Sequence, residues 1–238
     1  MQRSVNALAP LARLLARGGR ALGQLVAPNY CAACDAPLAA GATFCAECGE
    51  CPRAPTGLPL GAIAGGAYAP PLSTAIRRMK FGQRADLADR LSVLLPPVPL
   101  AEGVLVIPVP LHVGRLVERG FNAPALLARC WCRQRGAEFA PWALERWRET
   151  PHQAKLSARE RADNVREAFI AHEGAAGRRA ILLDDVVTTG ATLDACRRAL
   201  YAGGVVHVSV VALAGTPRAG SVSNTARGPE SLACEVRE

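Results

Sequence analysis

The 238-residue sequence contains no apolar run that approaches the ~20 residues needed to cross a membrane. Its first 27 residues scatter arginines among alanines and leucines, and they lack the compact apolar centre of a secretory signal. Leucines at helical spacing instead predict one amphipathic helix over residues 1–27 that packs on the body of the protein. We therefore expect a cytoplasmic protein with no transmembrane segment.

Two common phosphate-binding motifs are also absent. The chain has neither GxxxxGK[ST] nor GxGxxG, so P-loop and dinucleotide-binding domains fit poorly. A receiver domain places paired acids after its first strand, as this chain does at Asp184 and Asp185. Such a domain needs four more strands, however, and the sequence ends at residue 238. Any phosphate site must therefore be built in another way.

Acidic residues are in the minority. The chain has 28 Lys and Arg against 20 Asp and Glu, which gives a net charge of +8 and a pI of about 9.3. A basic surface suits nucleic acid, phosphorylated substrates or a membrane surface. The high alanine and arginine content is equally typical of GC-rich genomes, so charge alone does not choose a partner.

The cysteines favour metal binding over disulfides. There are nine, and an odd number argues against a closed disulfide framework. Cys31 and Cys34 form one CxxC, and Cys45 and Cys48 form a second after ten intervening residues. This spacing predicts a four-cysteine site for a structural Zn²⁺ in a small zinc-ribbon module over residues 28–52. A redox CxxC would not need two copies, and Cys51 is the one alternative ligand, in place of Cys48.

The rest of the chain has the pattern of one α/β domain over residues 61–215. Pro52–Pro59 is rich in proline and predicts a linker, and residues 216–238 have no periodicity and predict a disordered tail. A strand, loop, helix and strand from 180 to 213 form a βαβ unit, which requires a mostly parallel sheet flanked by helices. The expected buried strands are 104–109, 179–183 and 205–213, and the expected helices are 122–134 and 191–202.

The loop inside this βαβ unit carries the strongest functional signal. Asp184 and Asp185 follow an apolar strand, at the end of a parallel sheet where ligands bind. Small and hydroxylated residues then open the next helix, where backbone N–H groups and the helix dipole favour an anion. Carboxylates for sugar hydroxyls beside a cradle for phosphate describe a ribose 5-phosphate site. The cradle residues are Thr188, Thr189, Gly190, Ala191 and Thr192.

The run AILLDDVVTTGAT at 180–192 resembles the 5-phosphoribosyl pyrophosphate (PRPP) motif of type I phosphoribosyltransferases. The resemblance implies that Asp184 and Asp185 hold the ribose hydroxyls and that residues 188–192 wrap the 5′-phosphate. The pyrophosphate of PRPP needs Mg²⁺ and basic side chains to neutralise it. The candidates for this role are Lys80, Arg115 and Arg119; the alternative is that they are solvated surface residues in an arginine-rich chain.

Further motifs in order along the chain narrow the resemblance to the ComF family, which includes ComFC and GntX-like proteins. They are Tyr68, MKFGQ at 79–83, IPVPL at 107–111, Arg115, RGFN at 119–122 and TPHQAKLSARERADNVREAF at 150–169. Ala123 departs from the family pattern, which usually has Gln there. Gln153, Arg161 and Asn164 lie in a segment that is either a helix or a hood over the site.

The resemblance implies a role in natural competence and DNA uptake, and two functions follow from it. The first is an enzyme, a phosphoribosyltransferase of the glycosyltransferase class that uses PRPP or a related phosphorylated ribose and an unidentified acceptor. The second is a non-catalytic accessory protein that handles single-stranded DNA with the competence machinery and uses PRPP only as an effector.

Overall fold

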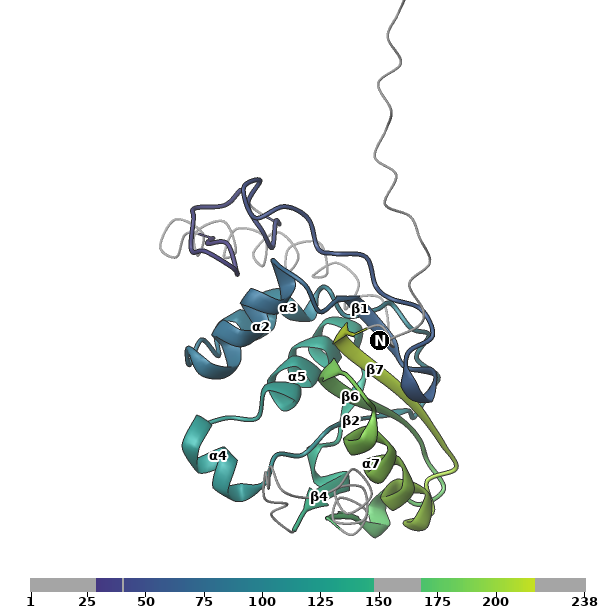
Figure 1. The fold of residues 1–238 in the computed structure, drawn as a ribbon. Helices are drawn as coiled ribbons and strands as arrows, with labels where there is room; N and C mark the ends of the chain where they lie inside the picture. The colour runs from purple at the N-terminus through teal and green to yellow at the C-terminus, as the bar shows by residue number, and fades with distance from the viewer. Residues whose placement is uncertain (1–28, 40, 148–167, 217–238) are drawn as a thin grey trace, which may run out of the picture.

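The computed structural model describes residues 29–39, 41–147 and 168–216 (Figure 1). The predicted helix over 1–27 lies outside these ranges, as do Gln153, Arg161 and Asn164 and the predicted tail beyond Thr216. No helix in the described ranges is both long enough and apolar enough to span a membrane.

A five-stranded parallel sheet forms the centre of the fold, with strand order β1-β7-β6-β2-β3. Its strands are β1 (Ile63–Ala67), β2 (Leu105–Pro108), β3 (Glu138–Phe139), β6 (Arg179–Val187) and β7 (His207–Gly215). The two central strands, β6 and β7, are rich in buried valine, leucine and isoleucine, as expected for strands covered on both faces. The predicted α/β fold with a mostly parallel sheet is therefore confirmed.

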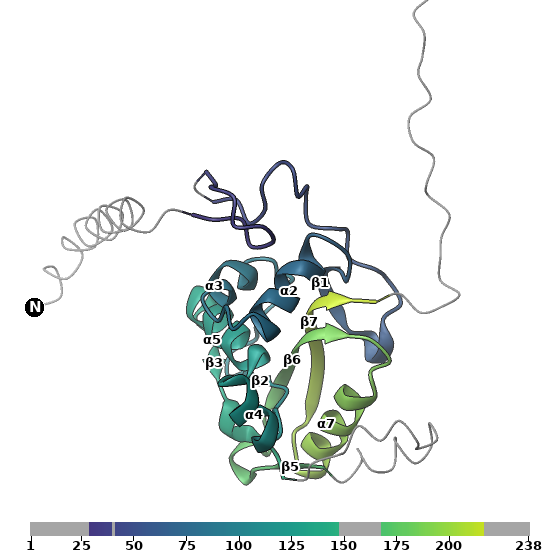
Figure 2. The same ribbon diagram turned by 60° about the vertical axis from the view of Figure 1, so that its left-hand side comes forward.

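Helices cover the two faces of this sheet unequally (Figure 2). On one face, α2 (Leu72–Phe81), α3 (Leu87–Ser92) and α5 (Ala123–Arg135) share a core with alternate residues of β6 and β7. The other face is covered by α7 (Ala191–Ala202) and by a small antiparallel pair, β4 (Leu144–Arg146) and β5 (Phe169–Ala171). The seven-residue α4 (Val113–Arg119) follows β2 and has no buried residue.

Most predicted elements occur where the hydrophobic pattern placed them. The helix at 191–202 has the predicted bounds, and α5 and β2 differ from 122–134 and 104–109 by one residue at each end. The predicted end of the second strand at Leu183 is wrong, because β6 continues to Val187. It continues because β7 stays paired with it as far as Gly215, so both acids lie within the strand.

Three 3₁₀ turns complete the connections, at Pro59–Gly61, Pro141–Ala143 and Glu173–Ala175. The predicted linker before the first of them packs on the domain. The Ala67 N–H donates to the carbonyl of Pro52 at 3.0 Å. A Cβ on Gly215 would lie 2.7 Å from the Leu58 side chain. This stretch therefore lies against β1 and β7 over part of its length.

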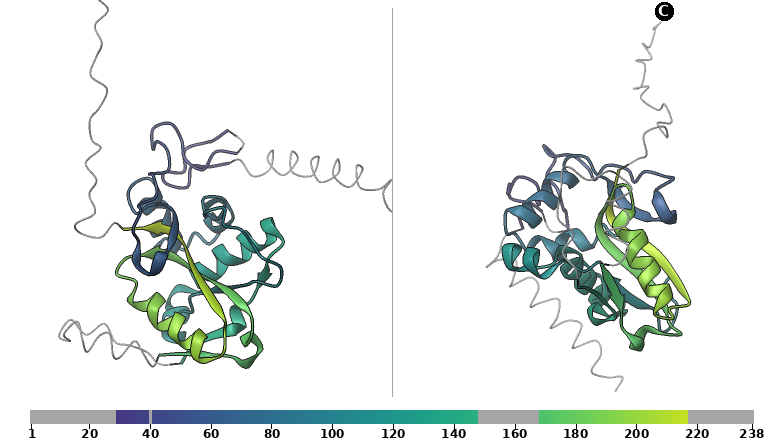
Figure 3. Two further views of the ribbon diagram at one scale, coloured as in Figure 1. Left: turned by 90° about the vertical axis from the view of Figure 1, so that its right-hand side faces the viewer. Right: turned by 60° about the horizontal axis from the view of Figure 1, so that its bottom comes forward.

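The Cys-rich segment lies against α2 and α3, away from α7 (Figure 3). The Arg78 guanidinium donates to the Ala32 carbonyl at 3.1 Å and pairs with Asp35, which also pairs with Arg84 at 3.0 Å. On α3, Arg90 donates to the Asn29 amide oxygen at 2.8 Å. Polar contacts thus join this segment to the same helix that carries Lys80.

Candidate functional site

The two acids at the carboxyl end of β6 face opposite sides of the sheet, because successive strand residues alternate. Asp185 faces α2, where its Oδ1 lies 2.6 Å from Nζ of Lys80, and both side chains are largely buried. Asp184 faces the α7 side, and its Oδ1 accepts the Asp185 N–H at 2.8 Å. The structure therefore brings Lys80 and both acids together, as one ion pair and one adjacent carboxylate.

The pKa of the Asp184 carboxyl group lies well above its usual value. Burial, together with the charge of neighbouring Asp185, raises the pKa of Asp184 to about 7, although the Asp185 N–H and Lys80 act in the opposite direction. The thiol of Cys196 is buried on α7, and burial raises its pKa well above the usual value, with a further contribution from the charge of Asp184. Hydroxyl donors or a cation at this position would stabilise the ionised form of Asp184.

A small hollow of about 50 Å³ separates Asp184 from the start of α7. It is lined by Asp184, Val186 and residues 188–193, and Thr188 and Thr189 are exposed. The first N–H groups of a helix have no partner inside the helix, so α7 offers them to this space. Asp184 and the predicted cradle residues thus line one hollow.

Gly190 fixes the shape of this loop. Its φ is 79°, a left-handed conformation that L side chains rarely adopt, and it is the N-cap of α7. A Cβ at this position would lie 2.6 Å from Cβ of Pro59, in the turn that precedes β1. The loop therefore requires glycine for its backbone conformation and for its contact with the 52–61 stretch.

The predicted basic residues gather on the α2 side of the acids. The Arg119 guanidinium lies over the ring of Phe81, 4.9 Å from its centroid, and Phe81 directly follows Lys80. Arg115 precedes Arg119 by one turn of α4, on the same side of the helix, and is partly buried. Arg119 thus lies beside the segment that carries Lys80, whereas Arg115 has no recorded contact with either acid.

The remaining residues of the RGFN motif shape the backbone. Gly120 has a φ of 76° and ends α4 in the left-handed conformation. The Asn122 amide donates to the Val109 carbonyl at 3.0 Å, which holds the loop against the end of β2. Gly120 and Asn122 of this motif therefore have structural roles, and Arg119 lies beside the site.

The four predicted metal ligands form one cluster. The sulfur atoms of Cys31, Cys34, Cys45 and Cys48 all lie within 4.8 Å of one another. The Cys34 and Cys45 sulfurs are 3.6 Å apart. Tetrahedral coordination with Zn–S bonds of ~2.3 Å requires sulfur separations of about 3.8 Å, so the cluster can hold a metal ion of this kind. Cys51 is outside the cluster, and its thiol contacts the Pro52 carbonyl.

The electrostatics of the cluster also suit a metal. Burial acts to raise the pKa of the Cys31 thiol, but backbone N–H groups of Cys45, Ala33 and Cys34 outweigh it and lower the pKa to about 6. Thiolates are the metal-binding form of cysteine. Cys130, Cys132 and Cys196 lie outside the cluster and are buried.

Sequence reasoning missed two contributions to the site. Phe81 is 67% exposed, and the Arg119 guanidinium lies over its ring. The sequence indicates Phe81 only as part of the MKFGQ motif and predicts no such contact. Pro59 was assigned to a linker and instead supports the loop at Gly190. Its place just before the first strand gave no signal of that contact, which joins segments far apart in the chain.

Comparison with known proteins gives a consistent set of relatives, although no family model matches the chain. The DNA utilization protein YhgH of Escherichia coli O157:H7 is 33% identical over 226 residues, covering 81% of this chain and 99% of the relative. The protein of the same name from Salmonella typhimurium is 30% identical over 207 residues, covering 79% and 91%. Competence protein F of Haemophilus influenzae is 31% identical over 198 residues, covering 78% and 84%.

Two solved structures also resemble part of this chain, over 53% and 54% of its length. They are the glutamine PRPP amidotransferase of B. subtilis and a structure described as the allosteric regulatory enzyme of purine biosynthesis. Each is 21% identical, with TM-scores of 0.36 and 0.35, and this chain spans about 25% of each. At these scores the fold class rests on the observed strand order and not on the alignments. The sequence relatives decide the family: this chain belongs to the ComF family, together with YhgH and competence protein F.

Proposed function

We propose that the chain binds PRPP through the loop between β6 and α7. The observation that supports this most strongly is the hollow between Asp184 and the first turn of α7. A 5′-phosphate in this hollow would accept hydrogen bonds from the N–H groups of residues 188–192 and from the hydroxyls of Thr188, Thr189 and Thr192. Asp184 and Asp185 would accept hydrogen bonds from the ribose hydroxyls.

The pyrophosphate would lie toward α2 and α4, where the basic side chains are. Lys80 already pairs with Asp185, and Arg119 lies on the adjacent Phe81, so both are positioned at this edge. We assign Arg115 to the same group. Mg²⁺ usually binds one or two carboxylates plus substrate phosphates, and the adjacent acids of β6 supply suitable carboxylates. When bound, the ion would neutralise charge on the departing pyrophosphate.

The first candidate activity is phosphoribosyl transfer, in the glycosyltransferase class. An acceptor would attack the anomeric carbon of PRPP as the bond to pyrophosphate breaks. The chain would supply the cradle that holds the 5′-phosphate, the acids that orient the ribose and the basic residues that stabilise the leaving group.

The second candidate is a non-catalytic role in DNA uptake, in which PRPP acts only as an effector. Its support is the surface around Phe81, where an exposed ring lies under Arg119 and one helical turn after the exposed Arg77 of α2. Aromatic rings beside basic side chains bind single-stranded DNA by stacking and by phosphate neutralisation. The names of the relatives, DNA utilization protein and competence protein, agree with this role.

We also propose that the four-cysteine cluster holds a structural Zn²⁺. A closed set of four thiolates leaves no coordination position for a substrate, which is typical of structural zinc. The ion would fold the segment that Arg78 and Arg90 hold against α2 and α3.

Calorimetric titration of the zinc-loaded full chain separates these functions. The ligands are PRPP with Mg²⁺, ribose 5-phosphate with Mg²⁺, and single-stranded oligo(dT). Asp184→Asn keeps the shape of the side chain and leaves the Lys80–Asp185 pair intact. It is expected to weaken PRPP binding by about tenfold or more, through loss of a charged hydrogen-bond acceptor, and to leave DNA binding unchanged.

Asp89→Asn is the matched control, because Asp89 is an exposed acid on α3 that pairs with Arg133 away from the loop. It should not change PRPP affinity. Equal PRPP affinity in wild type and Asp184→Asn would contradict the site. Phe81→Ala should weaken oligo(dT) binding if the second function holds. DNA binding without PRPP binding would contradict the PRPP site and leave only a DNA-handling role in which PRPP is not an effector.

A further inference from the structure

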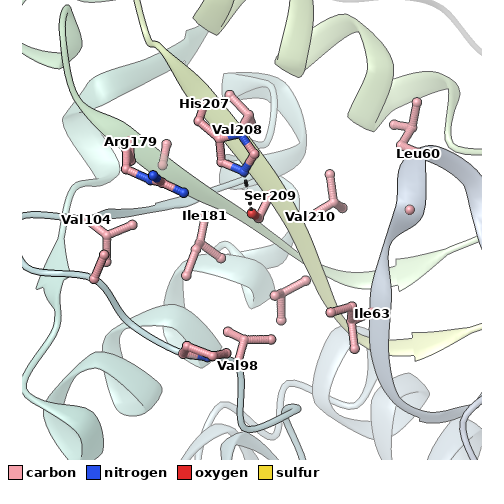
Figure 4. Close-up of a pocket in the computed structure, with 15 residues that line it drawn as sticks. Leu60, Ile63, Val98, Val104, Arg179, Ile181, His207, Val208, Ser209 and Val210 are labelled. Atoms are coloured by element: carbon pink, nitrogen blue, oxygen red, sulfur yellow. Dashed lines mark hydrogen bonds between the residues drawn. The ribbon is translucent and has the colours of Figure 1, made fainter.

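A hollow that the PRPP proposal does not use lies at the opposite end of the sheet. It has a volume of about 380 Å³ and is lined by the first residues of β6 and β7, the start of β1 and the 98–104 segment (Figure 4). Binding sites for small organic molecules are generally of this size. Arg179 and Asp184 are five residues apart on β6, or about 17 Å at ~3.3 Å per residue, so this hollow is separate from the phosphate loop.

Three polar side chains converge at one end of the hollow. Arg179 and His207 are direct neighbours in the register of β6 and β7, and Ser209 follows His207 on the same face of β7. The His207 ring nitrogen lies 3.1 Å from the Ser209 hydroxyl (Figure 4). All three side chains are exposed at the surface of the hollow.

Arg179 differs from the arginine beside it. Arg178 donates to the Gly103 carbonyl at 2.8 Å and pairs with Glu138 at 2.6 Å. Within the described part of the chain, the Arg179 side chain forms no hydrogen bond or ion pair, and its guanidinium extends over the hollow (Figure 4). None of the lining residues is acidic. A guanidinium without a carboxylate partner in such a place favours an anion.

The other end of the hollow is apolar. Ile181 follows Arg179 on the same face of β6, and Ile63 of β1 lies opposite Val211 of β7. Ile63 is 51% exposed and therefore available to a ligand. Val98 stands across from these strands in the wall formed by the 98–104 segment (Figure 4). A ligand that fits both ends has an apolar body and a charged head.

We propose that this hollow is a second binding site, for a small organic anion with an apolar body, such as an aromatic carboxylate. The carboxylate lies between the Arg179 guanidinium and the Ser209 hydroxyl, and the apolar body covers Ile63, Ile181 and Val98. A macromolecular segment is disfavoured, because the hollow is bounded on one side by the 98–104 wall. The site does not depend on PRPP binding.

The test is an NMR titration of the zinc-loaded, ¹⁵N-labelled full chain with 2-naphthoate and with its neutral analogue, 2-naphthalenemethanol. Amide shifts with 2-naphthoate are expected at 179–181 and 207–211. Arg179→Gln is expected to weaken 2-naphthoate by about tenfold and to leave the neutral analogue unchanged, because one charge-assisted contact is lost at a partly solvated position. Ile63→Ala should weaken both ligands.

The control variant is Arg198→Gln, an exposed arginine on α7 that pairs with Asp194 on the other side of the sheet. It should bind 2-naphthoate as the wild type does. Since Arg179 and Ile63 are both exposed, their substitution leaves the fold intact, and circular dichroism checks this. Absence of 2-naphthoate binding, shifts confined to another region, or equal affinity in wild type and Arg179→Gln would overturn the proposal.

Discussion

Replacing Asp184 by asparagine should stabilise the protein, and the gain should depend on pH. The carboxyl group has a folded-state pKa of about 7 and an ordinary value of 3.8. Between these values the folded state binds more protons than the unfolded state, so this group makes the protein less stable as pH rises from about 4 to about 7. Asparagine keeps the shape but carries no charge, and it removes this penalty.

The size of the effect follows from the shift. Each pKa unit corresponds to about 1.4 kcal/mol, so a shift of roughly three units sets an upper limit near 4 kcal/mol at pH 8. Coupling to Asp185 and Lys80 reduces this, and we expect a gain of about 1–3 kcal/mol at pH 8 that becomes small near pH 4.

Urea unfolding of both chains at several pH values between about 4 and about 8 provides the measurement. Comparing the two chains at the same pH cancels any effect of pH on the four-cysteine cluster. The same free-energy difference at every pH would refute the electrostatic reasoning, and so would a destabilised variant at pH 8. A stabilised variant that loses PRPP affinity would show that the acid is kept for binding and not for folding.

Three further changes have defined outcomes. Gly190→Ala places a side chain at positive φ and against Pro59. It should lower the free energy of unfolding by about 2–4 kcal/mol, measured by urea unfolding, and weaken PRPP binding, measured by calorimetry. An unchanged urea midpoint of unfolding would contradict the loop geometry. Lys80→Met leaves Asp185 buried without its partner and should destabilise the protein by about 3 kcal/mol at pH 8, as measured by urea unfolding; an unchanged free energy of unfolding would argue against the ion pair. Cys45→Ser should abolish stoichiometric zinc, measured by a colorimetric chelator, while the wild type releases about one equivalent; no metal in the wild type would remove the zinc assignment.

Local patterns predicted much of this molecule. The helix at 191–202 could be bounded because apolar residues recur at helical spacing and Gly203-Gly204 follow it. The two CxxC pairs identified the cluster because each turn is a local structure, and the ten residues between them are few enough to close one site. The PRPP motif located the hollow for the same reason, since its cradle is contiguous in sequence.

Contacts between distant segments could not be predicted in this way. The Lys80–Asp185 pair joins residues 105 positions apart, and it depends on how α2 lies on the sheet. The end of β6 was misplaced because acids usually mark a strand end, whereas here β7 continues the pairing past them. The hollow at Arg179 and His207 could not be predicted from the sequence either. It arises from the register of β6 and β7 and from the 98–104 segment, which leaves part of the face of the sheet uncovered.

The claim that the β6–α7 loop binds the phosphate of PRPP is tested most directly by hydrogen exchange with mass spectrometry. The zinc-loaded full chain is compared with and without PRPP and Mg²⁺. The cradle proposal requires the N–H groups of residues 188–193 to donate hydrogen bonds to the phosphate. Their exchange should therefore slow markedly on binding, and it should slow much less in Asp184→Asn at a PRPP concentration that does not saturate the variant. PRPP that binds while exchange at 188–193 stays unchanged, with protection elsewhere, would contradict it.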